Sequence, residues 1–215
     1  MRKPQALIFD WDNTLVDSWP SIHQALTETL VAMGHPVWSL ETTQERVRLS
    51  LRDSFPKLFG ERWTEARQIY LDAFRAIHLE QLRPLPGREA LVKDLDAAGY
   101  FLAIVSNKTG PLLRLEVERL GWEPHFRRTI GANDAAADKP RREPVDMALS
   151  DSGIEAGDAV WFVGDTAVDM ECAHNSGCVP VLLGDFDPAL PEFEECKPLL
   201  AFHDCSSLFS HLRTL

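Results

Sequence analysis

Short apolar runs alternate with longer amphipathic segments over most of this chain. The runs are almost uninterrupted and are bounded by polar or turn-forming residues. They span residues 6–9, 101–105, 159–163 and 179–183, with a shorter candidate at 129–131. Strands that are buried on both faces of a parallel sheet have this composition. The runs therefore predict the strands of a buried sheet.

Apolar residues at helical spacing fill the segments between the runs. Leu91, Leu95 and Ala98 lie on one face of an expected helix that Gly99 ends. Further helices are expected before Gly121, after Pro144 and before Gly177. An alternating order of strands and helices predicts an α/β fold, in which a parallel sheet carries helices on both faces.

Residues 18–85 interrupt this alternation because they read as helical throughout. Three apolar stripes contain Ile22, Leu26, Leu30 and Met33, then Val47, Leu51 and Phe55, and finally Ala66, Tyr70, Phe74 and Ile77. The second stripe is expected to end at Pro56, and linkers are expected at 17–20 and 83–87. The sequence thus predicts a core of residues 1–17 and 86–215 with a helical insert of residues 18–85.

Length and composition indicate a soluble globular protein. The 215 residues suit one core domain with one insertion, and the hydrophobic content of 45% is ordinary. No apolar run approaches membrane-spanning length, and the chain begins with the first expected strand instead of a signal peptide, so a cytoplasmic location is expected. The net charge of -11 argues against a nucleic-acid partner, because backbone phosphates attract basic surfaces.

The cysteines and histidines show no metal-binding spacing. Cys172, Cys178, Cys196 and Cys205 form neither Cys-x-x-Cys pairs nor a zinc pattern, so we expect reduced thiols. The scattered histidines are interpreted as structural or surface residues.

Polar residues follow the first apolar run directly. Asp10, Asp12 and Thr14 come where the strand at 6–9 is expected to open into a loop. Side chains two positions apart on an extended chain point the same way, so Asp10 and Asp12 can address one small ligand. Paired carboxylates of this kind also indicate a bound cation.

Three later segments place further polar residues close to expected strand ends. They are Ser106-Asn107-Lys108 after residues 101–105, Lys139 in Asp138-Lys139-Pro140, and Asp165 and Asp169 after residues 159–163. Ligands of open α/β sheets bind beyond the carboxyl ends of the strands. We therefore expect all four segments to face one pocket.

These four segments, in this order, resemble the four motifs of the haloacid dehalogenase superfamily, most of whose members are Mg²⁺-dependent phosphatases. The resemblance extends from Leu7 to Gly177. It implies a Rossmann-like, doubly wound core with an inserted helical cap that meets the core over the active site. It also implies a small-molecule phosphomonoester as substrate.

The resemblance assigns a role to each motif residue. Asp10 is expected to attack phosphorus and form an aspartyl-phosphate, and Asp12 to act as general acid and then general base. The expected phosphate-binding residues are Thr14, Ser106, Asn107 and Lys139. The expected Mg²⁺ ligands are Asp10, the Asp12 backbone carbonyl and Asp165, with Asp169 binding either directly or through water.

Two positions depart from the pattern of the superfamily. Asn13 stands where many relatives have Gly, and Asn tolerates the same turn conformations. The segment from Arg48 to Phe55 resembles the cap segment of phosphoglycolate-phosphatase-like members, with Arg48 in place of its opening Gly. Arg48 and Arg52 either hold an anionic leaving group or face solvent.

The leading hypothesis is a Mg²⁺-dependent phosphatase, and two alternatives stay open. A sugar-phosphate mutase similar to β-phosphoglucomutase would share every motif and differ in the access of water to the aspartyl-phosphate. A catalytically silent regulatory protein could use the same fold. A dehalogenase is disfavoured because dehalogenases of this superfamily lack a counterpart of Asp12. A phosphonate hydrolase would need a Schiff-base lysine, for which Lys57 is the only candidate between residues 18 and 85.

Overall fold

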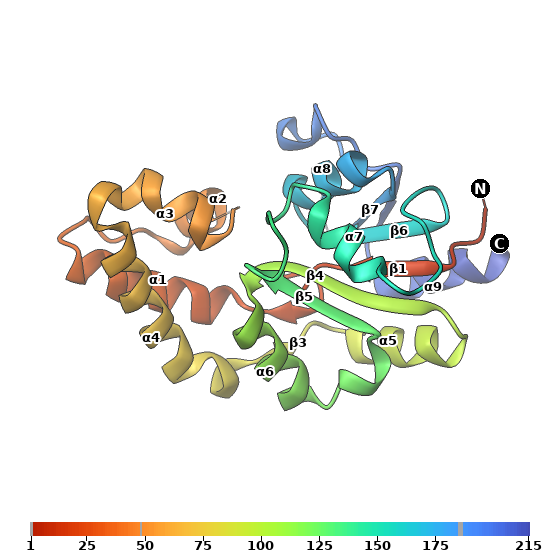
Figure 1. Cartoon of the computed structure of the whole chain (residues 1–215), viewed down its shortest axis with the longest axis horizontal. Helices are drawn as coiled ribbons and strands as arrows, with labels where there is room; N and C mark the ends of the chain where they lie inside the picture. Colours follow the sequence, from red (N-terminus) through yellow and green to blue (C-terminus); the bar gives the residue numbers. More distant parts are fainter. Residues whose placement is uncertain (1, 48, 185–186) are drawn as a thin grey trace.

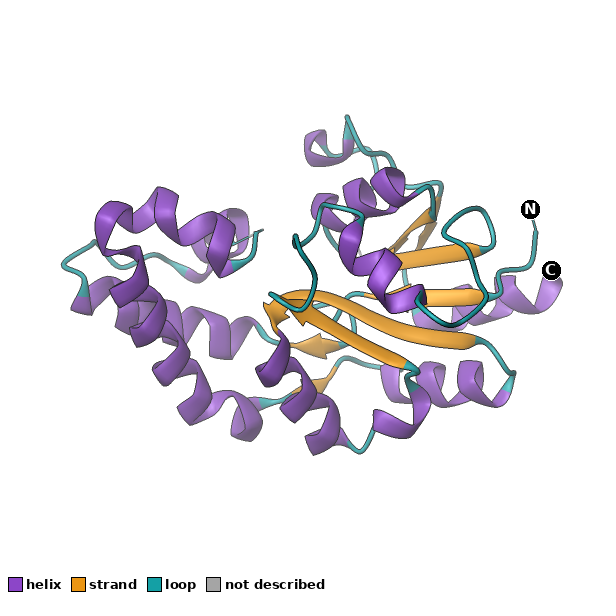
Figure 2. Cartoon of the chain, in the orientation of Figure 1, coloured by secondary structure: helices purple, strands orange, loops and turns teal. Residues whose placement is uncertain are grey.

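A parallel sheet forms the centre of the molecule (Figure 2). In the computed structural model, which describes residues 2–47, 49–184 and 187–215, this sheet has six strands in the order β5-β4-β1-β6-β7-β8. The strands are β1 (Ala6–Phe9), β4 (Phe101–Thr109), β5 (Arg128–Ala132), β6 (Val160–Gly164), β7 (Val179–Leu183) and β8 (Leu200–Phe202). Each neighbouring pair is parallel, so the predicted α/β sheet is confirmed.

The central strand β1 lies between β4 and β6. Ile8 is in register with Ala103 on one side and with Phe162 on the other. From β1 the chain passes to β4 and β5 on one side and then crosses to β6 on the other, and this order places a topological switch point at the carboxyl end of β1. Asp10 follows β1 at this switch point.

Helices cover both faces of the sheet. Helices α5 (Arg88–Ala97), α6 (Gly110–Leu120) and α9 (Cys205–Thr214) pack on the face that receives Leu7 and Phe9. Helices α7 (Glu143–Leu149) and α8 (Ala167–Ser176) pack on the face that receives Ala6 and Ile8. Successive side chains of a strand alternate between faces, so one short apolar run supplies both halves of the core.

The insert lies between two very short strands. β2 (Val16–Asp17) and β3 (Arg83–Pro84) pair antiparallel, with Asp17 opposite Arg83. Between them follow α1 (Trp19–Ala32), α2 (Leu40–Arg46), α3 (Leu51–Phe59) and α4 (Trp63–Gln81), on the left of Figure 1. Residues 18–85 were expected to be helical throughout, and this prediction is wrong at Arg83 and Pro84, which form β3. The bounds of residues 18–85 for the helical insert stay a prediction.

The second helical stripe differs from its prediction. Val47 follows α2, α3 begins at Leu51, and the helix continues through Pro56 to Phe59, so the expected end at Pro56 is wrong. Phe55 and Phe59 are buried with their ring centroids 5.0 Å apart. Their burial offsets the backbone hydrogen bond that proline cannot donate.

Three elements outside the insert also differ from expectation. β4 runs to Thr109, past the predicted end at 105, with a shift of its pairing with β5 after Val105. β8 and α9 were not predicted, because residues 200–202 show no clear alternation and 205–214 carry few apolar side chains.

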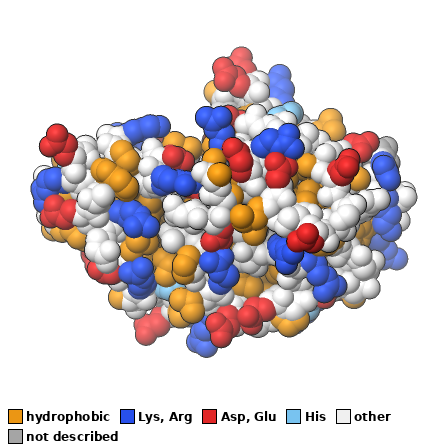
Figure 3. Space-filling view, in the orientation of Figure 1, with side chains coloured by type: hydrophobic (Ala, Val, Ile, Leu, Met, Phe, Trp, Pro, Cys, Tyr) orange, Lys and Arg blue, Asp and Glu red, His pale blue; other side chains and the backbone are white. Residues whose placement is uncertain are grey.

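No helix in the described part of the chain is both long enough and apolar enough to span a membrane. On the face shown in Figure 3, basic side chains are interspersed with acidic ones.

Candidate active site

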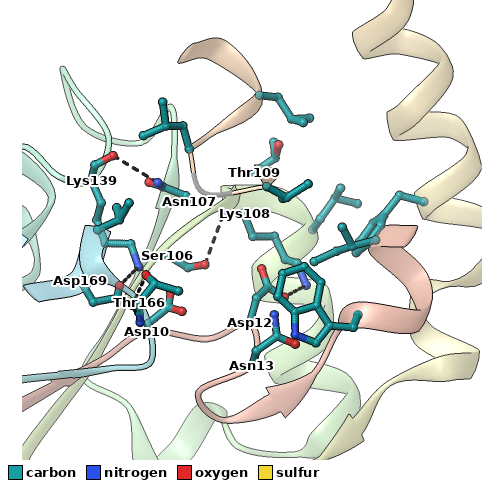
Figure 4. A pocket seen from close by; sticks show the side chains of 18 of the residues that line it. Asp10, Asp12, Asn13, Ser106, Asn107, Lys108, Thr109, Lys139, Thr166 and Asp169 are labelled. Atoms are coloured by element: carbon teal, nitrogen blue, oxygen red, sulfur yellow. Dashed lines mark hydrogen bonds and ion pairs between the residues drawn. The ribbon is translucent and has the colours of Figure 1, made fainter. Parts of the chain in front are cut away.

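The four predicted segments converge on one cavity of about 120 Å³ between the carboxyl edge of the sheet and the insert. Its lining contains nine polar residues from these segments, all of which are labelled in Figure 4: Asp10, Asp12, Asn13, Ser106, Asn107, Lys108, Lys139, Thr166 and Asp169. The expectation that all four segments face a single pocket is therefore met by the geometry. Thr14 and Asp165 are buried and are not among the residues of this lining.

Lys139 joins two of the carboxylates. Its Nζ donates to Asp10 Oδ1 at 2.6 Å and to Asp169 Oδ1 at 2.7 Å, and its side chain is only 3% exposed. Burial alone would lower the pKa of Lys139, but the two adjacent carboxylates outweigh it and raise this pKa above its usual value. Lys139 is therefore a fixed positive charge beside the expected nucleophile.

Thr14 contacts a carboxylate from the far end of the sequence. Its Oγ1 donates to Asp165 Oδ1 at 2.6 Å, and the side chain is fully buried. The hydroxyl thus positions Asp165 in this structure, and its expected contact with phosphate stays a prediction.

Asp169 is bound by protein donors at both carboxylate oxygens. Oδ1 accepts from Lys139, and Oδ2 accepts from the Thr166 backbone N–H at 3.0 Å and the Thr166 hydroxyl at 2.8 Å. A Cβ at Gly164 would come within 2.3 Å of Asp169, so only glycine fits at the end of β6. These contacts favour an indirect role for Asp169 towards a metal.

A divalent cation fits the charge of this cluster. Oxygens of Asp10, Asp165 and Asp169 lie within 4.8 Å of one another. Three carboxylates against the single ammonium of Lys139 leave two negative charges uncompensated. Accordingly, burial raises the pKa of Asp10 to about 7 although Lys139 opposes the shift, and burial also raises the pKa of Asp165. The donor set consists of hard oxygens, which suits Mg²⁺.

A second lysine binds the expected acid/base residue. Lys108 Nζ lies 2.5 Å from Asp12 Oδ1 and 2.6 Å from Glu116 Oε2. The Ser18 hydroxyl donates to the same Asp12 oxygen. Burial alone would lower the pKa of Lys108, but Asp12 and Glu116 outweigh it and raise this pKa. Asp12 therefore faces a permanent positive charge.

Glu116 is the centre of a polar cluster that the sequence analysis missed. It also accepts from Trp11 Nε1 at 2.7 Å and lies 2.7 Å from His78 Nδ1, and we call Trp11, His78, Lys108 and Glu116 the Glu116 cluster. Although burial opposes the shift, Lys108, His78 and Trp11 hold the pKa of Glu116 below its usual value. No spacing in the sequence connects these residues, because Trp11 and His78 are 105 and 38 residues from Glu116.

Ser106 and Asn107 hold the end of β4 in place. Ser106 Oγ accepts from the Lys108 backbone N–H at 3.2 Å, and Asn107 Nδ2 donates to the Lys139 carbonyl at 3.1 Å. Both side chains line the cavity.

Asn13 has φ of 63°, so it adopts the left-handed turn conformation expected of a residue in a Gly position.

Arg52 does not join the other predicted residues at the cavity. Arg52 pairs with Asp138, with Nε 3.0 Å from Oδ2 and Nη2 2.6 Å from Oδ1, and it is absent from the cavity lining. Arg48 lies outside the described residues. Their expected contact with a leaving group stays a prediction.

Comparisons with known proteins give consistent results. A family model described as haloacid dehalogenase-like hydrolase matches residues 7–182. A phosphoglycolate phosphatase of Xanthomonas campestris pv. campestris is 30% identical over 198 residues, covering 87% of this chain and 89% of that protein. A phosphoglycolate phosphatase of Psychrobacter arcticus is 26% identical over 97% of this chain and 95% of that protein.

Solved structures share the fold. A predicted phosphatase from Clostridium acetobutylicum superposes with a TM-score of 0.88 at 20% identity, covering 100% of both chains. A Had-superfamily hydrolase from Ehrlichia chaffeensis is 29% identical with a TM-score of 0.68, covering 100% of this chain and 98% of that one.

Proposed function

Because this chain belongs to the haloacid dehalogenase-like hydrolase family, we propose that it is a phosphatase that hydrolyses a small-molecule phosphomonoester through an aspartyl-phosphate on Asp10. The observation that supports this most directly is the position of Asp10. Its carboxylate lines the cavity at the switch point of the sheet, beside Lys139 and two further carboxylates.

In the first step, an Asp10 oxygen attacks phosphorus in line with the leaving oxygen. Asp12 donates its proton to that oxygen as the ester bond breaks. Lys139, the Ser106 hydroxyl and the Asn107 backbone N–H would stabilise the phosphoryl oxygens. In the second step, Asp12 takes a proton from water, which attacks phosphorus and frees Asp10 and inorganic phosphate.

The metal site we propose consists of Asp10, Asp165 and the Asp12 backbone carbonyl, with Asp169 acting through water. Mg²⁺ bound there would neutralise charge and let the anionic nucleophile and the phosphate approach each other. Thr14 orients Asp165 for this role through its hydrogen bond.

A generic aryl phosphate tests the proposal without knowledge of the natural substrate. Hydrolysis of p-nitrophenyl phosphate is expected with Mg²⁺, is lost with a chelator and returns when Mg²⁺ is restored. Asp10→Asn keeps the size of the side chain but removes the nucleophile, so it is expected to abolish turnover while the circular dichroism spectrum is unchanged. Undiminished turnover in metal-free buffer, or in Asp10→Asn, would contradict the mechanism.

A further inference from the structure

Two consecutive carbonyl groups of the loop after β1 are bound by the segment that follows β3. The Thr14 carbonyl accepts a hydrogen bond from Arg88 Nε at 2.7 Å, and the Leu15 carbonyl accepts one from the Leu85 backbone N–H at 3.0 Å. The loop that begins at the expected nucleophile is therefore held by the linker that leads back from the insert and by the first residue of α5.

The Arg88 guanidinium also contacts the last helix of the chain. Its Nη1 donates to Cys205 Sγ at 2.7 Å, at the start of α9, and Arg88 is only 6% exposed. Hydrogen bonds from a charged donor are stronger than those between neutral groups, and burial strengthens them further. Arg88 thus holds the Thr14 peptide in a fixed position relative to α9.

Thr14 transmits this contact to a carboxylate. Its Oγ1 donates to Asp165 Oδ1 at 2.6 Å, and both side chains are buried. Because threonine is branched at Cβ, its side chain has few rotamers, so the position of the Thr14 peptide determines where the hydroxyl lies. Asp165 is one of the carboxylates that we propose as Mg²⁺ ligands. A shift of the Thr14 peptide would therefore disturb a ligand of the metal.

We propose that Arg88 is a positioning residue for the metal site, an inference that rests on the function proposed above. By holding the Thr14 carbonyl, Arg88 keeps the Thr14 hydroxyl on Asp165 and keeps this carboxylate oriented for the cation. Groups that orient a metal ligand typically raise metal affinity about 10- to 100-fold. Arg88 acts through one further residue, so an effect of about tenfold is expected.

Arg88→Met tests this role, because methionine fills part of the space but donates no hydrogen bond to Thr14. The variant is expected to bind Mg²⁺ about tenfold more weakly in calorimetry without substrate. It should also need correspondingly more Mg²⁺ for half-maximal hydrolysis of p-nitrophenyl phosphate, while KM for this ester at saturating Mg²⁺ changes little. A purely structural role of Arg88 would not produce this split.

Arg88→Lys provides a partial rescue. Lysine keeps the charge and a donor but lacks the planar fork that reaches two acceptors, so its Mg²⁺ affinity is expected to lie between those of Arg88→Met and the wild type. Should Arg88→Met fail to fold, wild-type Mg²⁺ affinity in Arg88→Lys would overturn the proposal.

The sign of the change distinguishes positioning from an effect of charge. A guanidinium repels a divalent cation, so Arg88 acting through its charge alone would weaken Mg²⁺ binding, and its removal would tighten it. Tighter or unchanged binding to Arg88→Met would therefore overturn the proposal.

Thr14→Val tests the route of the effect. Valine keeps the shape of threonine but removes the hydroxyl that contacts Asp165. In this background Arg88→Met is expected to weaken Mg²⁺ binding by no more than about twofold, because the contact through which Arg88 acts is already lost. A further loss as large as in the wild-type background would show that Arg88 acts by another route and would overturn the proposal.

Two control variants separate positioning from stability and from the loss of any arginine. Leu208 is fully buried on α9, so Leu208→Ala is expected to lower Tm but to keep Mg²⁺ affinity. Arg119 is exposed on α6, so Arg119→Met is expected to change neither quantity. If Leu208→Ala weakens Mg²⁺ binding as much as Arg88→Met does, the effect reflects stability and the proposal fails.

Calorimetry of the wild type separates this inference from the proposed function. If the wild type binds Mg²⁺ but hydrolyses no phosphomonoester, the proposed function fails, while weaker Mg²⁺ binding by Arg88→Met would still support the role of Arg88. If the wild type binds no Mg²⁺, the inference is overturned together with the metal site.

Discussion

His78 on insert helix α4 lies 2.7 Å from Glu116 on core helix α6, and both side chains are buried. Glu116 binds Lys108, and Lys108 binds Asp12. A continuous series of polar contacts therefore connects the insert to the residue that we expect to act as acid and base. The position of the insert and the charge environment of Asp12 are linked through these side chains.

Glu116→Gln tests the importance of this link. The change removes one of the two carboxylates around Lys108 and is expected to lower the free energy of unfolding by about 3 to 5 kcal/mol, as for the loss of one partner of a buried ion pair. It is also expected to reduce kcat more for alkyl than for aryl phosphates, because only alkyl leaving groups depend on the proton from Asp12. Urea denaturation and steady-state kinetics measure the two effects.

Glu118 provides the matched control for this substitution. It lies on the same helix but is exposed, so Glu118→Gln is expected to change neither stability nor the ratio of the two rates. Equal effects of the two substitutions would show that the Glu116 cluster has no special role.

Mg²⁺ affinity is expected to rise with pH. In the metal-free protein burial raises the pKa of Asp10 from 3.8 to about 7, so at lower pH a cation must displace a proton from this carboxyl. The gain in Tm on adding Mg²⁺ should therefore be larger at about pH 8 than at about pH 5.5. Asp10→Asn removes one of the two titrating ligands and is expected to weaken this dependence, while the part that comes from Asp165 stays. A larger gain at the lower pH would contradict the assignment of Asp10 to the metal site.

The raised pKa of Asp10 also determines how the stability of the metal-free protein changes with pH. As pH rises from about 4 to about 7, the unfolded chain releases the Asp10 proton before the folded chain does. Metal-free protein should therefore lose this contribution to its stability over that interval. Thermal unfolding in a chelator across the interval measures the loss, and a rise in Tm that disappears in Asp10→Asn would contradict it.

The cysteine thiols are expected to react slowly in the native protein. Cys172, Cys178, Cys196 and Cys205 are free and buried, and burial raises the pKa of Cys172, Cys178 and Cys196. A thiol reagent at neutral pH should therefore label these four only as fast as the protein unfolds. Ser206→Cys adds a thiol at an exposed position and should react at once. Rapid labelling of wild type would contradict the buried positions.

Sequence patterns predicted the sheet and the position of the site because both depend on short-range features. The apolar run at residues 6–9 forms β1, so Asp10 directly follows β1, just as Asp165 directly follows β6. By contrast, β2 and β3 contain two residues each, which is too short to show a period. Helix α2 carried a signal that was missed, since Ser39 accepts from the Thr42 backbone N–H and caps it.

The Glu116 cluster could not be predicted because its members come from distant parts of the chain. His78 and Trp11 are 38 and 105 residues from Glu116. In the sequence alone, Glu116 resembles a surface glutamate, His78 a helical histidine and Trp11 a core tryptophan. Only the packing of α4 against α6 makes them one cluster, and the same packing buries their charges.

Asp12→Asn is expected to separate the two chemical steps. An alkyl ester needs a proton on its leaving oxygen, so formation of the aspartyl-phosphate from it should slow roughly 10²- to 10⁴-fold, whereas a nitrophenolate departs unaided. The aryl ester should then give a burst of nitrophenol in rapid mixing, followed by slow turnover. Wild-type rates for both esters in this variant would show that Asp12 is not the acid and base.

Location of the phosphoryl group in this variant tests the nucleophile most directly. Asp12→Asn mixed with p-nitrophenyl phosphate and Mg²⁺, then quenched in acid during the burst, should carry one phosphoryl group on Asp10 in peptide mass spectrometry. The variant that combines Asp10→Asn with Asp12→Asn should carry none. A burst without a phosphorylated peptide, or a phosphoryl group on another residue, would contradict nucleophilic catalysis by Asp10.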